Sequence, residues 1–158
     1  MSNRTMGTSI FSCNCKGCKA LYGLPNQLSL SMEVCSEAPC YNEDYPSDIY
    51  MSINGRSCGH YHSPGDYGCR RGIYTPDFWQ NGLTQYRKLV TREINQEGTF
   101  INGERVSNLR IEELQAETGD YIKFRIECRE SSKHCGGFNL FGEKAGDYDQ
   151  PIILTLGH

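Results

Sequence analysis

Residues 49–62, IYMSINGRSCGHYH, carry the clearest strand and turn signals of this sequence. Its first half alternates apolar and polar side chains, with Ile49, Met51 and Ile53 in phase, which is typical of a strand with one buried face. Asn54-Gly55 follows at once, and this dipeptide favours the two-residue turn of a β-hairpin. Residues 58–62 then return as the partner strand, so the stretch predicts an antiparallel hairpin.

The same alternation recurs along the chain. It marks strands at residues 28–35, 84–94, 122–128 and 152–156, and a second Asn-Gly hairpin within residues 100–106. Residues 109–114 offer one short helical turn at most. Many short strands separated by turns every 8–12 residues or so predict a sandwich or barrel. We therefore expect an all-β fold, with a jelly-roll β-sandwich over residues 28–158 and a cysteine-rich amino-terminal arm or first strand over residues 1–27.

Size, charge and hydropathy exclude several classes of function. A chain of 158 residues fits one domain. Its net charge of −3 and its lack of a basic stripe argue against nucleic-acid binding. Since no run of about 18 apolar residues occurs, we expect no membrane span. The first residues lack the apolar segment of a signal peptide, so we expect synthesis in the cytoplasm.

Five strings of this sequence resemble a known bacterial family: MEVCSEAPCYNEDYPSDIYMSING, SPGDYGCRRGIYTPDFW, LTQY, EGTFINGERVSN and GGFNLFGEKAGDYDQPIILTL. They are similar to the carboxy-terminal domain of ArsR-like winged-helix transcriptional regulators, where the domain follows the DNA-binding part and is presumed to sense a ligand. The resemblance covers about four-fifths of the chain, in the same order. It implies a β-sandwich of the sensor type without known catalytic residues.

The departures from that family matter as much. There is no winged helix, so the DNA-binding role does not carry over, and the opening strands of the domain are curtailed to the residues up to Asn26. Cys40 and Cys69 stand where the family tends to have glycine. The nine cysteines are many for a reduced cytosolic protein of this size, which indicates either metal binding or an encounter with oxidant after synthesis.

Three cysteines cluster at the amino-terminal end, at positions 13, 15 and 18. Thiolates at this spacing can wrap a Zn²⁺ ion if a fourth ligand comes from elsewhere. Alternatively, Cys13, Cys15 and Cys18 form disulfides, because nine thiols cannot all pair within one chain, or they are exposed thiols in a loose tail. The candidate disulfide partners, on a neighbouring copy of the chain, are Cys40, Cys58, Cys69, Cys128 and Cys135.

Two further groups are candidate metal ligands. Alternation along a strand places Cys58, His60 and His62 on one face, where they could hold one ion, although a solvated polar face is the preferred interpretation. Carboxylates also crowd the loop before residue 49. Glu37, Glu43, Asp44 and Asp48 could bind Ca²⁺, but a solvated acidic loop is again preferred.

A glycine-punctuated, aromatic segment at residues 65–86 is a candidate ligand-binding face. If it is exposed, Trp79 would stack on a sugar or another small molecule, while polar side chains would donate and accept hydrogen bonds. If it is buried, the aromatic side chains close one end of the sandwich, and for Trp79 that interpretation is preferred. The candidate ligand-binding residues are Asp66, Arg70, Arg71, Trp79 and Gln85.

No arrangement of residues predicts catalysis, so we expect no enzyme. The first hypothesis for function is a structural subunit that polymerises through its amino-terminal arm into a disulfide-linked filament or surface layer, without a cofactor. It implies homo-oligomers and an extracellular, cell-surface or spore-surface location after assembly. The alternative is a free-standing module that binds a small molecule or a carbohydrate, with Zn²⁺ as a possible cofactor, and that stays in the cytoplasm.

Overall fold

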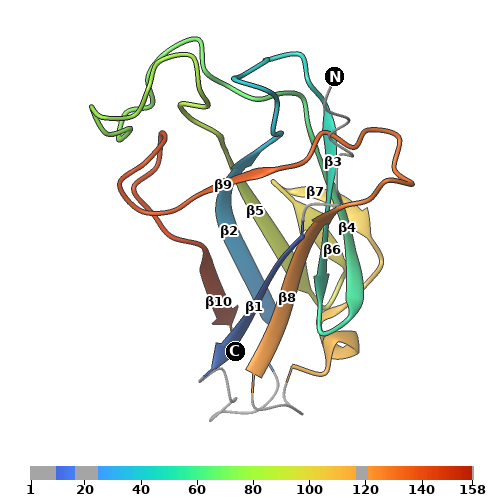
Figure 1. Ribbon diagram of the computed structural model, residues 1–158. Helices are drawn as coiled ribbons and strands as arrows, with labels where there is room; N and C mark the ends of the chain where they lie inside the picture. The colour runs from blue at the N-terminus through green and yellow to red at the C-terminus, as the bar shows by residue number, and fades with distance from the viewer. Residues whose placement is uncertain (1–9, 17–24, 117–120, 158) are drawn as a thin grey trace.

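The computed structural model describes residues 10–16, 25–116 and 121–157, and its strands form two antiparallel sheets (Figure 1). The four-stranded sheet has the order β1 (Ile10–Lys16), β8 (Tyr121–Cys128), β3 (Ser47–Ile53) and β4 (Arg56–Ser63). The other sheet has the order β10 (Ile153–Gly157), β2 (Gln27–Cys35), β5 (Lys88–Asn95), β6 (Thr99–Ile101) and β7 (Glu104–Ser107), and β9 (Asn139–Phe141) also pairs with β2. A 3-10 helix, η1, spans Ile111–Leu114.

Both Asn-Gly dipeptides form the expected hairpin turns. Asn54 and Gly55 have φ angles of 48° and 78°, and Asn102 and Gly103 have φ angles of 49° and 85°. Positive φ at both central positions is the signature of the turn whose twist matches that of the flanking strands. The hairpins β3–β4 and β6–β7 are therefore confirmed.

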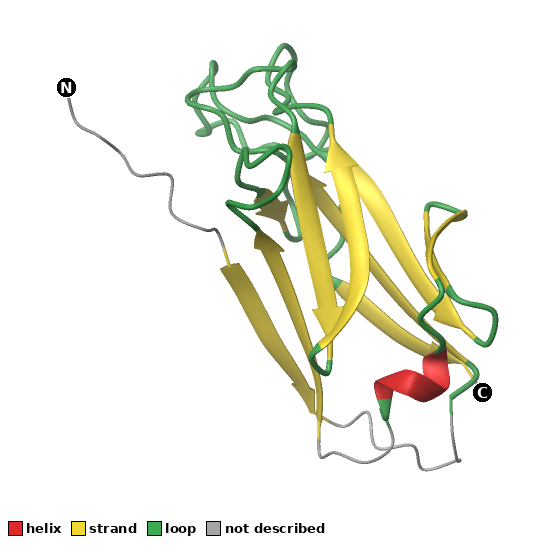
Figure 2. Cartoon of the chain, turned by 90° about the vertical axis from the view of Figure 1, so that its right-hand side faces the viewer, coloured by secondary structure: helices red, strands yellow, loops and turns green. Residues whose placement is uncertain are grey.

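One hydrophobic core lies between the two sheets and takes side chains from both. It contains every second residue of β2, β3 and β8, which confirms the alternation expected for these segments. Its main members are Leu28, Leu30, Met32, Val34, Ile49, Met51, Ile53, Ile122, Phe124 and Ile126. The all-β class is thus correct, and the two sheets around a common core are compatible with a sandwich (Figure 2).

A β-bulge in β4 changes which side chains share a face. Tyr50 pairs with His60 and Ser52 pairs with Ser57, so two residues of β4 lie opposite one residue of β3. Gly59 supplies the positive φ of 77° that this irregularity requires. As a result Cys58 is fully buried in the core, whereas His60 and His62 are exposed. The shared face expected for Cys58, His60 and His62 is therefore wrong.

The amino-terminal segment contains a strand. Residues 10–16 form β1, which pairs antiparallel with β8 along its whole length. The backbone of Cys13 lies opposite that of Phe124, and the backbone of Cys15 lies opposite that of Ile122. Cys18, the third cysteine of the cluster, lies outside the described residues. Within the segment 1–27, residues 10–16 are therefore a strand.

Most of the long loops lie at one end of the two sheets, and the 3-10 helix lies at the other (Figure 2). Part of the strand expected at residues 84–94 belongs to this loop end, because β5 begins only at Lys88. The backbone N–H of Gln85 instead donates to the carbonyl of Tyr67, at 2.8 Å. Within the described residues no helix has the length and hydropathy needed to cross a membrane.

Candidate metal centre

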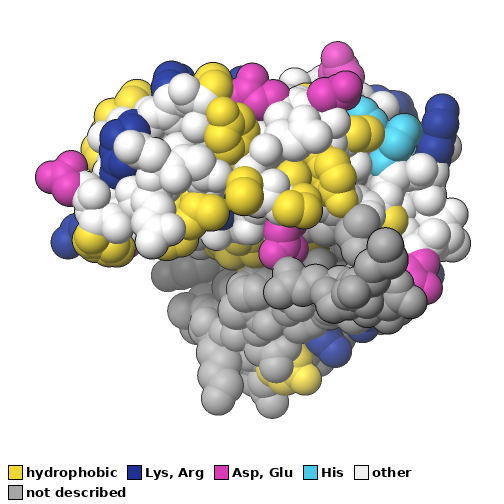
Figure 3. Space-filling model, turned by 45° about the horizontal axis from the view of Figure 1, so that its top comes forward, with side chains coloured by type: hydrophobic (Ala, Val, Ile, Leu, Met, Phe, Trp, Pro, Cys, Tyr) yellow, Lys and Arg dark blue, Asp and Glu magenta, His cyan; other side chains and the backbone are white. Residues whose placement is uncertain are grey.

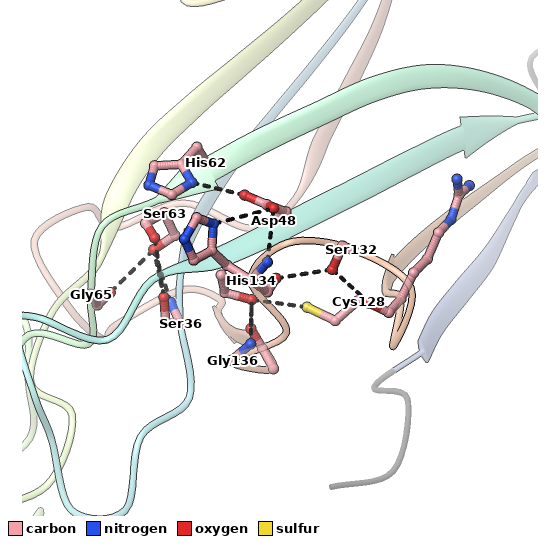
Figure 4. Close-up of polar contacts among 12 residues, drawn as sticks. Ser36, Asp48, His62, Ser63, Gly65, Cys128, Ser132, His134 and Gly136 are labelled. Atoms are coloured by element: carbon pink, nitrogen blue, oxygen red, sulfur yellow. Dashed lines mark hydrogen bonds and ion pairs between the residues drawn. The ribbon is translucent and has the colours of Figure 1, made fainter.

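An aspartate and two histidines meet at the loop end of the four-stranded sheet (Figure 4). Asp48 lies near the start of β3 and His62 near the end of β4, where strand pairing places them directly opposite each other. Side chains in such a cross-strand pair lie on the same face of the sheet. The Oδ1 atom of Asp48 is 2.8 Å from the Nδ1 atom of His62.

The third member, His134, comes from the loop that follows β8. This loop is attached to β3 through the backbone of Asp48, whose N–H donates to the carbonyl of His134 at 2.9 Å. In return, the backbone N–H of His134 donates to Oδ2 of Asp48 at 3.1 Å, and the imidazole Nδ1 lies 3.5 Å from the same oxygen. The rings of His62 and His134 meet edge to face, with centroids 5.1 Å apart.

The hydroxyl groups of Ser47 and Ser132 stabilise the His134 loop through hydrogen bonds. Ser47 donates to the carbonyl of Gly137 at 2.7 Å and accepts from the backbone N–H of Gly136 at 3.2 Å. The Ser132 hydroxyl lies within hydrogen-bond distance of the carbonyls of Arg129 and His134, at 2.5 and 3.0 Å. The position of His134 is therefore fixed by its backbone, and both hydroxyls are engaged with carbonyl groups.

The three side chains differ in exposure and charge. The Asp48 side chain is 8% exposed, against 31% for His134 and 50% for His62. Burial alone would raise the pKa of the Asp48 carboxyl, but hydrogen bonds from His62 and from the backbone N–H of His134 outweigh it, so this pKa lies below its usual value. A buried carboxylate is thus held at the bottom of a site whose imidazoles are open to solvent.

This donor set suits a transition-metal ion. One ligand atom from each of the three residues lies within 4.8 Å of the other two. A tetrahedral Zn²⁺ ion makes bonds of about 2.0–2.2 Å to nitrogen and oxygen ligands, so three ligand atoms this close together can surround one ion. Imidazole and carboxylate ligands together suit Zn²⁺, Cu²⁺, Ni²⁺ and Fe²⁺. Three protein ligands leave at least one coordination position for water or another ligand.

Sequence patterns gave only part of this site. The sequence predicts His62 as a candidate ligand with other partners. It predicts Asp48 as a Ca²⁺ ligand or, by preference, as part of a solvated acidic loop, whereas Asp48 is a buried residue of a strand. His134 carried no signal, because it lies in an irregular loop 72 positions after His62 in a chain without a metal motif. Pairing of β3 with β8 is the feature that brings its loop to Asp48.

The five candidate ligand-binding residues do not form one face. Asp66 and Gln85 are buried. Asp66 accepts a hydrogen bond from the backbone N–H of Ala38 at 2.9 Å, and the Gln85 amide donates to the carbonyl of Gln80 at 2.8 Å. Both side chains therefore support the loops instead of facing a ligand.

The other three candidates, Arg70, Arg71 and Trp79, lie at the surface of the loop end. Arg70 makes two hydrogen bonds to the carboxylate of Asp147, at 2.9 and 2.6 Å. Arg71 donates to the carbonyls of Pro76 and Trp79 and to the side chain of Asn81. Trp79 is 38% exposed, so the expectation of a core position is wrong. Figure 3 shows this end, with hydrophobic side chains spread among polar ones and histidine at the surface.

One buried carboxylate, that of Glu33 in β2, joins separate segments of the loop end. Its Oε1 atom accepts hydrogen bonds from the backbone N–H groups of Arg87 and Asp147, at 2.9 and 3.0 Å, and its Oε2 atom accepts one from Tyr148 at 3.3 Å. Gly146 packs so closely that an added Cβ would lie 2.2 Å from Oε1. Because all these partners are backbone groups, the carboxylate joins three segments of the fold and is not free for a ligand.

The candidate cross-linking cysteines differ in accessibility. All six cysteines with described side chains are free thiols: Cys35, Cys40, Cys58, Cys69, Cys128 and Cys135. Cys40 and Cys69 are exposed and Cys135 is half-buried. Burial raises the pKa of both Cys58 and Cys128 to about 11. In the folded chain these two thiols are therefore shielded from a neighbouring molecule.

Comparisons with known protein families, curated proteins and solved structures find no match for this chain. The case for a function therefore depends on the geometry of its own residues.

Proposed function

We propose that this chain is a non-catalytic binding module that takes a divalent transition-metal ion, with Zn²⁺ as the reference ion, at Asp48, His62 and His134. The observation that carries the proposal is the convergence of one ligand atom from each residue within 4.8 Å. The site is preorganised, because hydrogen bonds to the backbone fix both Asp48 and the His134 loop before any ion arrives.

Binding is preferred over catalysis because of the neighbouring side chains. The two hydroxyls beneath the site, from Ser47 and Ser132, are engaged with backbone carbonyls and with the loop that they hold. A hydrolytic reaction at the ion would need a general acid or base placed next to the metal-bound water. The neighbouring His60, which interacts electrostatically with Asp48, packs against Tyr50 with ring centroids 5.0 Å apart and is not one of the ligands.

The order of the strands supports jelly-roll connectivity for this module. Along the chain, β1 belongs to the four-stranded sheet, β2 to the other, β3 and β4 to the first, β5 to β7 to the second, and β8 again to the first. Repeated crossing between two antiparallel sheets is compatible with the Greek-key connections of a jelly roll.

The test is a Co²⁺ and Zn²⁺ titration of the full chain. Co²⁺ bound through nitrogen and oxygen lacks the intense near-ultraviolet charge-transfer bands of a cobalt–thiolate site, so its spectrum separates this centre from the cysteines at positions 13, 15 and 18. His62→Gln and His134→Gln should each weaken binding at this centre by at least about tenfold, since even supporting residues of metal sites contribute that much.

His60→Gln is the matched control, because His60 is an exposed histidine two residues away on the same strand. It stacks against Tyr50, with ring centroids 5.0 Å apart, and is outside the cluster. The proposal predicts unchanged affinity for this variant. Equal affinities for all three variants, or a purely thiolate spectrum, would refute it.

A second candidate function is disulfide-linked assembly of many copies. Two observations favour it: β1 is an edge strand, paired within the described residues on one side only, and the thiols of Cys40 and Cys69 are exposed. Mass spectrometry of unreduced peptides from the native source should then find Cys13, Cys15 or Cys18 joined to Cys40 or Cys69 of another copy. Free thiols at positions 13, 15 and 18, or one Zn²⁺ held by them in each chain, would exclude this function.

A further inference from the structure

A groove of about 400 Å³ lies on the outer face of the four-stranded sheet. Its lining comes from β3, β4 and β8 and from the residue just after β8, namely Ser52, Ser57, Lys123, Arg125, Glu127 and Arg129. These positions alternate with the core residues of β3 and β8, which is why their side chains point away from the core. None of them belongs to the candidate metal centre.

The groove is positively charged although the chain as a whole is negative. Three basic side chains, those of Lys123, Arg125 and Arg129, face a single acidic one, that of Glu127, in a protein of net charge −3. The Glu127 carboxylate accepts from Nε of Arg129 at 2.8 Å and lies 3.0 Å from Nη2 of Arg125. The hydrogen bond from Arg129 holds the pKa of Glu127 below its usual value, so the carboxylate is ionised and cancels one positive charge of three.

Several hydrogen-bond donors in the groove remain available. Each guanidinium group has five N–H donors, of which Glu127 occupies only some. Within the described part of the chain, the Lys123 ammonium and the hydroxyls of Ser52 and Ser57 have no hydrogen-bond or ion-pair partner.

Two of the donors are also held in place. The guanidinium group of Arg129 lies over the ring of Tyr50, 4.2 Å from its centroid, and its Nε atom is 2.8 Å from the carboxylate of Glu127. Glu127 likewise fixes Arg125. A ligand would therefore meet two oriented guanidinium groups with little loss of side-chain entropy, and oriented guanidinium groups match the planar or tetrahedral arrangement of oxyanion oxygens.

We infer that this groove binds a small oxyanion ligand, one that carries phosphate or carboxylate groups. The chemistry of the donors is the same for both groups: two guanidinium groups, one ammonium group and two hydroxyls around an open volume. Gly55 also lines the groove, and no described atom lies within 4 Å of the place where its Cβ would be. This site is independent of the proposed metal centre.

Inorganic phosphate and citrate, added separately to the full chain at constant ionic strength, test the inference. Backbone amide shifts in nuclear magnetic resonance should change saturably at Gly55, Lys123 and Arg125 with at least one of the two anions. Lys123→Gln should weaken that binding by about fivefold, a typical contribution for a partly exposed charge pair. Ser57→Glu, which places a carboxylate inside the groove, should abolish it.

Lys144→Gln is the control, because Lys144 is exposed, lies outside the groove, and its loss changes the net charge by the same amount. Its affinity should stay within about twofold of the unaltered chain, as expected for a screened charge at a distance. The Lys123 side chain is exposed and forms no hydrogen bond or ion pair with the described residues, so Lys123→Gln should remain folded. Shifts that do not saturate with either anion, or equal weakening by both lysine variants, would overturn the inference.

Discussion

Replacing Glu33 by alanine should destabilise the whole loop end. The side chain is 1% exposed and accepts three backbone hydrogen bonds, from Arg87, Asp147 and Tyr148. A hydrogen bond to a charged group contributes roughly 1.5–3 kcal/mol. Burial offsets part of this stabilisation, because desolvation raises the pKa of Glu33 above its usual value despite the three hydrogen-bond donors. We therefore expect Glu33→Ala to lower the free energy of unfolding by about 3–4 kcal/mol.

Glu33→Gln provides a graded comparison. The amide keeps the shape of the side chain and one oxygen acceptor, but its NH₂ group faces a backbone N–H donor, so the expected loss is about 1–2 kcal/mol. Urea unfolding followed by circular dichroism measures both variants, with Glu104→Ala, at an exposed position of β7, as the control within about 0.5 kcal/mol of the unaltered chain. A loss below about 1 kcal/mol for Glu33→Ala would refute the view that this carboxylate joins the loops.

Two other outcomes follow from the same structure. A thiol reagent applied to the reduced, folded chain should label Cys40 and Cys69 quickly, because both are exposed. Cys58 and Cys128 should react only after unfolding, because burial raises the pKa of both thiols to about 11. Peptide mapping that finds Cys58 labelled as fast as Cys40 would contradict the packing. Asp147→Asn should cost about 1 kcal/mol near neutral pH, since the ion pair with Arg70 is half-exposed. The hydrogen bonds from Arg70 lower the pKa of Asp147 in the folded chain. The contribution of Asp147 to stability is therefore complete above its pKa in the unfolded chain and disappears as the pH falls through its pKa in the folded chain. The difference in unfolding free energy between Asp147→Asn and the unaltered chain should shrink below about pH 4, and a difference independent of pH would be inconsistent with the ion pair.

Local signals predicted the strands better than the site. Alternation located β2, β3 and β8 and their buried residues because side-chain direction in a strand depends only on position parity. The same rule failed in β4, where the bulge at Gly59 reverses the parity and separates Cys58 from His60 and His62. Gly59 is the local sign of this bulge, because an isolated glycine inside a strand pattern suggests one. The consequence for the two histidines depends on the pairing with β3, which the sequence of β4 alone does not specify.

Local sequence patterns were enough to predict the all-β class of the fold and its two Asn-Gly turns. An Asn-Gly dipeptide adopts positive φ at low cost, which favours a tight turn. Alternating apolar and polar residues place one face of a strand toward the core. Both properties depend only on neighbouring residues in the sequence. The candidate metal centre was decided by tertiary structure, because its three ligands come from β3, from β4 and from a loop beyond β8. Their meeting requires that β8 pairs with β3, and that pairing is a property of the whole folded core, which no single stretch of the chain encodes.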